Sequence, residues 1–231
     1  MFPDAPSLRA VKHLQELASL AQAGEYRSNV LFVISNPHAG RFVPGIHIDP
    51  DFAAALKKVA RAVDLQAAVV ACDAAGVVRL VKDSIPIDLA PAEAALADSG
   101  AYLLRLKLDT FRTIKIGALG SIQFEPGEYI YVGSAMAKLE KRVARHLRRR
   151  KRFHWHIDYL RDAADHVAAF PIRSLKRLEC SLAEDMSRIS RNSIAGFGSS
   201  DCSCNSHLFR IKPGDERFER LLLRYRHRDS L

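Results

Sequence analysis

Residues 116–135, IGALGSIQFEPGEYIYVGSA, together with GAYLLRL at residues 100–106, decide the fold of the second half of this 231-residue chain. Over 101–108, polar side chains alternate with leucines, which is typical of a strand with one buried face. Two further strands are expected over 113–117 and 128–132. These stretches therefore predict a small sheet.

Helices are predicted in the sequence after these strands. Leu139, Val143 and Leu147 recur every four residues within 138–149, so they form the inward face of a strongly amphipathic helix. Further helices are predicted over 154–164, 178–189 and 215–225.

The first half of the chain alternates helices with strands. Helices are predicted over 8–21 and 49–63, and strands over 30–34, 67–72 and 77–81. The run at 30–34 is apolar throughout, which is typical of a buried strand. Residues 86–99 are rich in alanine and proline and lack periodicity. We therefore assign a first domain to 1–90, a linker to 91–99 and a second domain to 100–231.

Composition favours a folded cytoplasmic protein without a membrane segment. Hydrophobic residues make up 48% of the chain, which is enough for a core. No apolar run is long enough to span a bilayer, and the N-terminus lacks the pattern of a signal peptide. Four cysteines are too few and too clustered for a disulfide scaffold.

The excess positive charge lies entirely in the second half. Residues 1–99 carry nine basic and eleven acidic side chains, a net charge of −2, whereas the remainder carries +11. A folded domain this basic suggests a polyanionic partner, most simply DNA or RNA. The alternative is a solvated basic surface, and charge alone does not decide between the two.

The second half resembles the GIY-YIG nuclease superfamily, and in particular its Uri-type subfamily. The resemblance is carried by GAYLLRL (100–106), IGALGSIQFEPGEYIYVGSA (116–135), RVARHLRRRKRFHWHIDYL (142–160), EC (179–180) and GFGSSDCSCNSHLFR (196–210). It implies an α+β domain with a small, mainly antiparallel sheet flanked by helices.

The resemblance also implies an active site. The two tyrosines of the superfamily fall on Tyr102 and Tyr131, its arginine on Arg142, and its metal-binding glutamate on Glu179. This implies one divalent metal, Mg²⁺ or Mn²⁺, two tyrosines near the attacking water, and an arginine on the scissile phosphate. His146 is an accessory candidate on the same predicted helix as the arginine.

Elementary chemistry agrees with this assignment. Phosphodiester hydrolysis needs a nucleophilic water, a Lewis acid and charge stabilisation on the phosphoryl oxygens. One glutamate can anchor Mg²⁺, because this ion keeps several waters. A tyrosine becomes a base only if a metal or nearby cations lower its pKa. Taken singly, the four residues are equally well strand aromatics, a surface arginine and a helix-start glutamate.

A run of basic residues adjoins the predicted arginine. Residues 138–152 hold nine Lys or Arg and one Glu. Five of these basic residues are spaced four or three apart, so we predict one helical stripe that binds phosphates: Lys138, Arg142, Arg145, Arg149 and Arg152. The alternative is a solvated helix face.

Two smaller clusters complete the candidates. His156 and Asp158 would either ligate metal or contact phosphate, or serve the fold, whereas Trp155 is assigned to the core. Cys202, Cys204 and His207 could supply three zinc ligands, with a fourth from Cys180 or another histidine. We favour a tight turn with structural thiols instead, because C-x-C-x2-H is short of a standard zinc spacing.

The first half resembles the C-terminal third of sugar fermentation stimulation protein A (SfsA). The segments FPDAPSLRAVKHLQELASLAQAGEYRSNVLFVIS (2–35) and HIDPDFAAALKKV (47–59) carry the resemblance. It implies a remnant of a PD-(D/E)XK-like nuclease core. No E-x-K occurs in a strand setting within 1–99, so the nuclease metal site of that core is expected to be missing.

The sequence therefore predicts a metal-dependent endonuclease acting on DNA or RNA. A catalytically silent nucleic-acid-binding module is the first alternative, and a regulatory interaction protein is the second. The sequence makes no prediction of the oligomeric state or of DNA against RNA.

Overall fold

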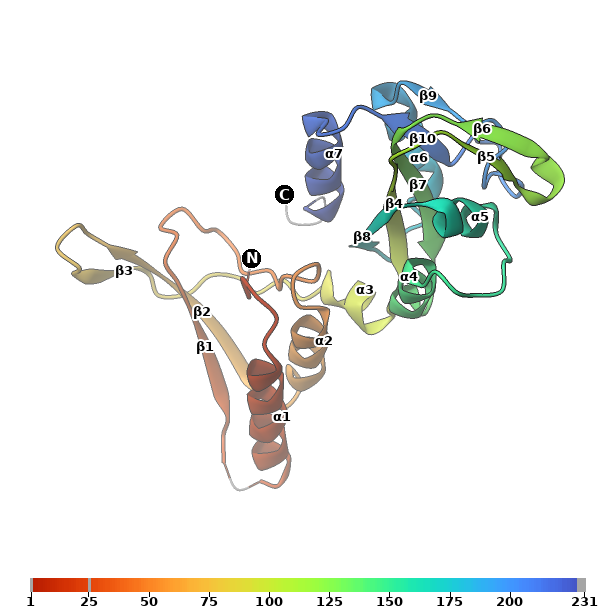
Figure 1. Ribbon diagram of the computed structural model, residues 1–231. Helices are drawn as coiled ribbons and strands as arrows, with labels where there is room; N and C mark the ends of the chain where they lie inside the picture. Colours follow the sequence, from red (N-terminus) through yellow and green to blue (C-terminus); the bar gives the residue numbers. More distant parts are fainter. Residues whose placement is uncertain (1, 25, 228–231) are drawn as a thin grey trace. The chain divides into compact units, whose positions relative to one another are not determined.

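The computed structural model describes residues 2–24 and 26–227 (Figure 1). The chain divides into two compact units, Met1–Leu96 and Ala97–Leu231. Each unit has a hydrophobic core of its own.

The first unit places two helices on a three-stranded sheet. Its elements are α1 (Leu8–Gln22), β1 (Asn29–Ile34), α2 (Pro50–Val59), β2 (Asp64–Cys72), β3 (Val78–Lys82) and α3 (Ala92–Leu96). The strand order is β1-β2-β3, with β1 parallel and β3 antiparallel to β2. The buried Asp49 joins the two helix starts, because its carboxylate accepts hydrogen bonds from the backbone N–H groups of Ser7 at 2.8 Å and Phe52 at 2.9 Å.

Two expectations for this unit are wrong in detail. Strand β1 is not buried on both faces: Phe32 packs into the core, but Leu31 and Val33 remain 56% and 60% exposed. Successive side chains of a strand point to opposite faces of the sheet, and helices cover only one face of this sheet, so every second side chain stays exposed. Residues 92–96 of the expected linker form α3, because Ala92 and Ala94 are buried, Ala92 in a cluster shared with α2.

The second unit is built on a five-stranded antiparallel sheet. Its strands are β4 (Gly100–Leu108), β7 (Gly127–Ala135), β8 (His166–Arg173), β9 (Asn192–Ser193) and β10 (Leu208–Ile211), in the order β8-β4-β7-β10-β9. A separate hairpin joins β5 (Arg112–Lys115) to β6 (Ser121–Phe124) through a short 3₁₀ turn at Gly117–Leu119. The mixed α/β class with small antiparallel sheets is confirmed.

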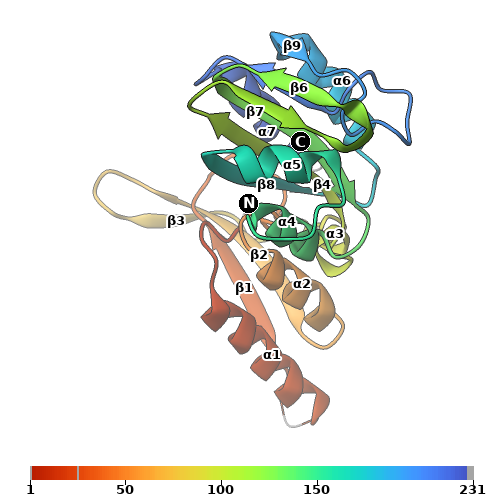
Figure 2. The ribbon, with the colours of Figure 1, turned by 45° about the vertical axis from the view of Figure 1, so that its right-hand side comes forward.

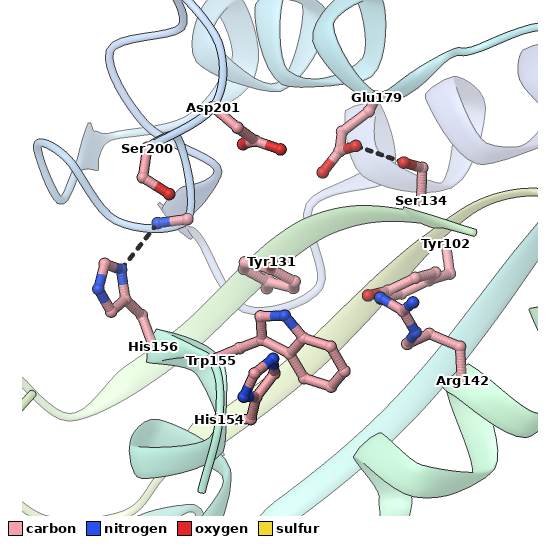
Figure 3. Close-up of a pocket in the computed structure, with 11 residues that line it drawn as sticks. Tyr102, Tyr131, Ser134, Arg142, His154, Trp155, His156, Glu179, Ser200 and Asp201 are labelled. Atoms are coloured by element: carbon pink, nitrogen blue, oxygen red, sulfur yellow. Dashed lines mark hydrogen bonds between the residues drawn. The ribbon is translucent and has the colours of Figure 1, made fainter. Parts of the chain in front are cut away.

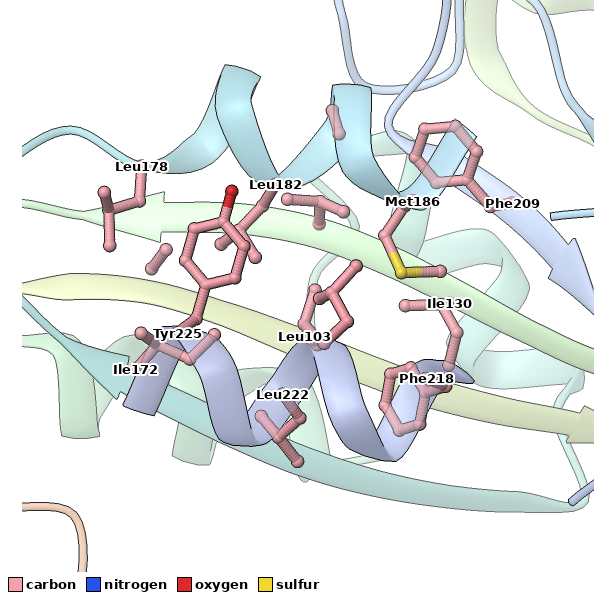
Figure 4. Close-up of a cluster of buried hydrophobic side chains, with 14 of the residues drawn as sticks. Leu103, Ile130, Ile172, Leu178, Leu182, Met186, Phe209, Phe218, Leu222 and Tyr225 are labelled. Carbon is pink, nitrogen blue, oxygen red and sulfur yellow. The ribbon is translucent and has the colours of Figure 1, made fainter. Parts of the chain in front are cut away.

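Helices cover both faces of the five-stranded sheet. One face packs against α4 (Leu139–Leu147) and α5 (His156–Ala163), and α5 lies in front of the strands in Figure 2. The other face packs against α6 (Glu179–Ile189) and α7 (Glu216–Arg226), as Figure 4 shows. Alternation along β4 sends Tyr102 to the first face and Leu103 to the second.

Helix α4 is shorter than predicted, because it ends at Leu147 and Arg148 is already extended. Strands β6, β8, β9 and β10 were not predicted. Within the described residues, no helix is long and apolar enough to cross a membrane.

Candidate active site

One pocket of about 330 Å³ gathers the four residues predicted for the active site (Figure 3). They come from four elements: Tyr102 from β4, Tyr131 from β7, Arg142 from α4 and Glu179 from α6. The pocket is completed by Ser134, His154, Trp155, His156, Gly198, Ser200 and Asp201.

The two tyrosines form the floor of this pocket. Tyr102 and Tyr131 are 2% and 7% exposed, and their ring centroids lie 6.4 Å apart. They share a face because β4 and β7 are antiparallel neighbours and each residue sits at an inward position. Burial raises the pKa of both phenols well above the ordinary value, and the negative charge of Glu179 adds to this. Both tyrosines are therefore neutral at physiological pH.

Two glycines make room for these rings. Gly133 pairs with Tyr102 across the strands, and a Cβ on Gly133 would overlap the Tyr102 phenol. Gly198 adopts a φ of +72°, and a Cβ there would lie 2.8 Å from the Tyr131 ring. The glycine of the YIG motif is thus required by the tyrosine of the other motif.

Arg142 presents a positive charge to the pocket. Its guanidinium carbon lies 4.6 Å from the ring centroid of Trp155, which also contacts Arg145 at 4.3 Å. Among the described residues, Arg142 forms no ion pair with a carboxylate, but it interacts with the Tyr102 phenol. Trp155 packs against the core, as predicted, but its half-buried ring also lines the pocket and contacts this arginine.

Glu179 is held at the start of α6 by two partners. Ser134 donates its hydroxyl to one carboxylate oxygen, and His207 Nδ1 lies 3.2 Å from the other. Burial opposes ionisation of Glu179, but His207 and Ser134 outweigh it, so the pKa of this carboxyl lies below its ordinary value. The helix N-terminus favours the same charge. Glu179 is therefore an anion that still faces the pocket.

A histidine connects the floor of the pocket to a buried carboxylate. Tyr102 Oη and His146 Nε2 are hydrogen-bonded at 3.0 Å, and His146 Nδ1 lies 3.7 Å from Asp158 Oδ1. Burial lowers the pKa of His146, so its neutral form is favoured. His146 thus joins the site, although only one of its nitrogens reaches a pocket residue.

Asp158 does not line the pocket but lies behind it, where it holds the surrounding chain. It is fully buried, accepts a two-pronged hydrogen bond from Arg145 at 3.1 and 3.0 Å, and pairs with Lys151 at 2.8 Å. Although burial would raise the pKa of Asp158, the nearby His146 ring, the hydrogen bonds from Arg145 and the ion pair with Lys151 bring it well below its ordinary value. The interpretation of Asp158 as a metal or phosphate ligand is therefore wrong. His156 does line the pocket, where Nδ1 accepts the backbone N–H of Gly198 at 3.2 Å.

The predicted basic stripe does not exist as one helical face. Helix α4 ends at Leu147, so Arg149 and Arg152 lie beyond it, and Lys138 is a left-handed residue before its first turn. Arg145 is committed to Asp158, and Arg149 Nε donates to the carbonyl of Asp162 at 3.2 Å. The physical reason is that Lys151 and Arg145 converge on Asp158, which folds the chain back after α4.

The three candidate zinc ligands do come together, and Cys180 joins them. One ligand atom from each of Cys180, Cys202, Cys204 and His207 lies within 4.8 Å of all the others. His207 Nε2 lies 3.4 Å from Cys202 Sγ. Burial raises the pKa of the Cys204 thiol to about 12.

Sequence reasoning missed several pocket residues. Ser134 directly follows the YIG glycine, and Ser200 and Asp201 lie within residues 196–210, where only the cysteines and the histidine had been predicted as ligands. Figure 3 shows the carboxyl groups of Asp201 and Glu179 facing each other above Tyr131. Their proximity depends on tertiary structure, which residue spacing does not encode.

Comparison with known proteins separates the same two halves. The family model "Domain of unknown function DUF123" matches residues 101–227, which is more than half of the chain. The model "Sugar fermentation stimulation protein RE domain" matches residues 1–76. The expectation that the first half is a C-terminal fragment of that family is therefore wrong, because the match is to the family's RE domain.

Curated relatives of the first half are sugar fermentation stimulation protein homologs. One from Symbiobacterium thermophilum is 48% identical over 61 residues, which cover 26% of this chain and 24% of that protein. One from Carboxydothermus hydrogenoformans is 47% identical over 62 residues, covering 27% and 26%. The chain therefore spans about a quarter of the length of these relatives.

One solved structure, that of Pyrococcus furiosus SfsA in complex with Ca²⁺, is 28% identical to this chain and aligns with 38% of each chain at a TM-score of 0.36.

Proposed function

The chain belongs to the DUF123 family, and we propose that its second unit is a metal-dependent endonuclease of the GIY-YIG type that hydrolyses phosphodiester bonds of DNA or RNA. One observation supports this proposal above all others. Tyr102, Tyr131, Arg142 and Glu179 are separated by up to 77 residues, yet they line the same pocket. Their residue types match the needs of phosphodiester hydrolysis.

The acidic wall of the pocket fits a divalent metal. Glu179 is ionised and faces the pocket, and the Asp201 carboxyl lies opposite it. Mg²⁺ or Mn²⁺ is suited to such a site, because these ions need few carboxylates and keep several waters. When bound, the metal would supply Lewis acidity and a more acidic water.

Arg142 is the group we assign to the scissile phosphate. Its guanidinium packs on the Trp155 ring and also interacts with the Tyr102 phenol. Because Arg142 forms no ion pair with a carboxylate among the described residues, its positive charge remains available to an anion. Arginine recognises phosphate through two parallel N–H donors. The excess positive charge of residues 100–231 would bring the polyanion to this unit.

Tyr102 and His146 offer a route for the proton of the attacking water. Because Tyr102 keeps its proton, it can serve as a base only if it passes that proton on as it accepts another. Neutral His146 accepts at Nε2 when its Nδ1 proton faces Asp158. The water proton then moves to Tyr102 Oη while the phenolic proton moves to His146 Nε2, and the charge that forms on the imidazole is stabilised by Asp158.

Glu179→Gln tests the proposal. The change keeps the size of the side chain but removes its charge, so metal-dependent cleavage of supercoiled plasmid, single-stranded DNA or RNA should fall by orders of magnitude. Nucleic-acid binding without metal should hold or rise, because one negative charge leaves the pocket. Cleavage would be measured with Mg²⁺, with Mn²⁺ and with EDTA.

A matched control is available in the same unit. Glu216 is the first residue of α7, as Glu179 is of α6, but it pairs with Arg220 on the exposed surface. Glu216→Gln should cleave like the wild type. If Glu179→Gln also cleaves like the wild type, Glu179 is not the metal ligand. If the wild type binds nucleic acid but cleaves none of the substrates, the silent-module alternative is correct.

A further inference from the structure

Three cysteines and one histidine converge beside the pocket, from parts of the chain that are distant in sequence. Cys180 lies in the first turn of α6, Cys202 and Cys204 lie in the loop before β10, and His207 directly precedes β10. Their four ligand atoms lie within 4.8 Å of one another. This is the only such group of His, Cys, Asp or Glu within residues 2–24 and 26–227.

From this geometry we infer that Cys180, Cys202, Cys204 and His207 bind one zinc ion in a structural Cys₃His site. In tetrahedral zinc sites the ligands lie about 2.0–2.3 Å from the metal and therefore ~3.5–3.8 Å from one another. From a spread of 4.8 Å, each ligand atom would move by less than about 1 Å to reach the metal. Four protein ligands leave no open position, which is the mark of a structural rather than a catalytic zinc site.

The orientation of His207 supports this assignment. The side chain is 1% exposed, its Nε2 faces Cys202 Sγ at 3.4 Å, and its Nδ1 faces Glu179 Oε1 at 3.2 Å. One nitrogen thus faces the thiol cluster, where it could ligate zinc, while the other lies close to a carboxylate. Histidines that bind zinc commonly make this second hydrogen bond, which fixes the ring and its tautomer.

The inferred zinc site would stabilise one wall of the pocket. It ties the first turn of α6, which carries Glu179, to the loop that carries Ser200 and Asp201. Through His207, it would also fix the carboxylate of Glu179. Only the importance of Glu179 for catalysis rests on the proposed nuclease; zinc binding itself does not.

Zinc content tests the inference directly. The full chain, purified without chelator, should contain one zinc per chain by elemental mass spectrometry. Cys180→Ser and Cys204→Ser should each lose most of it. Cys72→Ser is the matched control, because Cys72 is an exposed cysteine of the first unit, and it should keep one zinc per chain.

A second measurement guards against variants that fail to fold. Co²⁺ added to the metal-free wild type should give the intense absorption of a tetrahedral site with thiolate ligands, and zinc should abolish it. Titration of denatured, metal-free protein should find four reactive thiols, in agreement with four free cysteines. A wild type without zinc and without the Co²⁺ signal overturns the inference, and so does a disulfide between two of these cysteines.

The zinc site and the nuclease can fail separately. Glu179→Gln should keep its zinc while losing cleavage. A wild type that holds zinc but cleaves no substrate supports the zinc site and contradicts the proposed activity. A wild type that cleaves nucleic acid but holds no zinc supports the activity and contradicts the zinc site.

Discussion

Tyr102 keeps its proton in the pocket, and that makes its neighbour His146 decisive for the proposed chemistry. Burial raises the pKa of the phenol and lowers the pKa of the imidazole, so the pair is neutral as a whole at physiological pH. A neutral imidazole can accept a proton, but a protonated one cannot. The decrease in the cleavage rate at low pH, the acid limb of the pH–rate profile, should therefore reflect protonation of His146.

We predict that cleavage falls as the pH drops through the lowered pKa of His146, below the ordinary value of about 6.5. His146→Ala should lower kcat by ~10²–10⁴-fold, the range of general-base contributions, and should remove this limb. The pH profile of single-turnover cleavage would measure both effects.

His166→Ala is the control for that measurement, because His166 is an exposed histidine at the start of β8. The stability of the fold should depend on pH in the same direction as cleavage. The unfolded state binds the proton of His146 more readily than the native state does, so the fold loses stability as the pH falls below about 6.5. An unaltered acid limb in His146→Ala would assign that limb to another group.

Residue types in an ordered motif series were enough to predict the four pocket residues, but not their partners. Tyr102, Tyr131, Arg142 and Glu179 were assigned from the sequence and lie together. The burial of Asp158 depends on Arg145 and Lys151 turning toward it, which no local pattern encodes. Cys180 was no more than one suggestion for a fourth ligand, because it lies 22 residues from Cys202.

At the scale of elements, alternation predicted the strands with clear periodicity and missed the others. β4 and β7 were predicted because leucines or aromatic residues recur at every second position. β8 was missed because its sequence, HVAAFPIR, contains small residues and Pro171. Its place at the edge of the sheet explains why a proline is tolerated there.

Strand β1 gives a prediction at this scale. Phe32 stacks on Phe42 with ring centroids 4.2 Å apart inside the core, whereas its neighbour Leu31 is on the exposed face. Phe32→Ala should lower the free energy of unfolding of the first unit by about 3–5 kcal/mol, because it leaves a cavity. Leu31→Ala, the matched control, should change it by less than about 0.5 kcal/mol.

Hydrogen exchange of the β1 and β2 amides would measure this difference, because it reports on the first unit separately from the second. Equal destabilisation by the two substitutions would mean that the outer face of β1 is covered in solution.

At the scale of the whole molecule, the two units differ in net charge as well as having separate hydrophobic cores. The first 99 residues carry a net charge of −2 and the remainder carries +11. Binding of a polyanion is therefore expected to reside in the second unit, and the first unit, similar to an RE domain, is proposed to act as an accessory module.

The structure changes which arginines should set the salt dependence of that binding. Arg145 is bound to the buried Asp158, whereas Arg148 and Arg150 are exposed beyond the end of α4. Each phosphate contact contributes about 0.9 to the slope of log K against log salt on double-stranded DNA. Replacing both Arg148 and Arg150 with alanine should therefore lower the magnitude of this slope by about 1.8 while leaving the melting temperature nearly unchanged.

Arg145→Ala should instead leave the slope nearly unchanged and lower the melting temperature, because loss of its charged hydrogen bonds to Asp158 should destabilise the fold by ~1.5–3 kcal/mol. Binding of a short duplex, measured by fluorescence anisotropy across a salt series, separates the two effects. A wild-type slope in the double variant would show that nucleic acid approaches the pocket from a side that this basic segment does not reach.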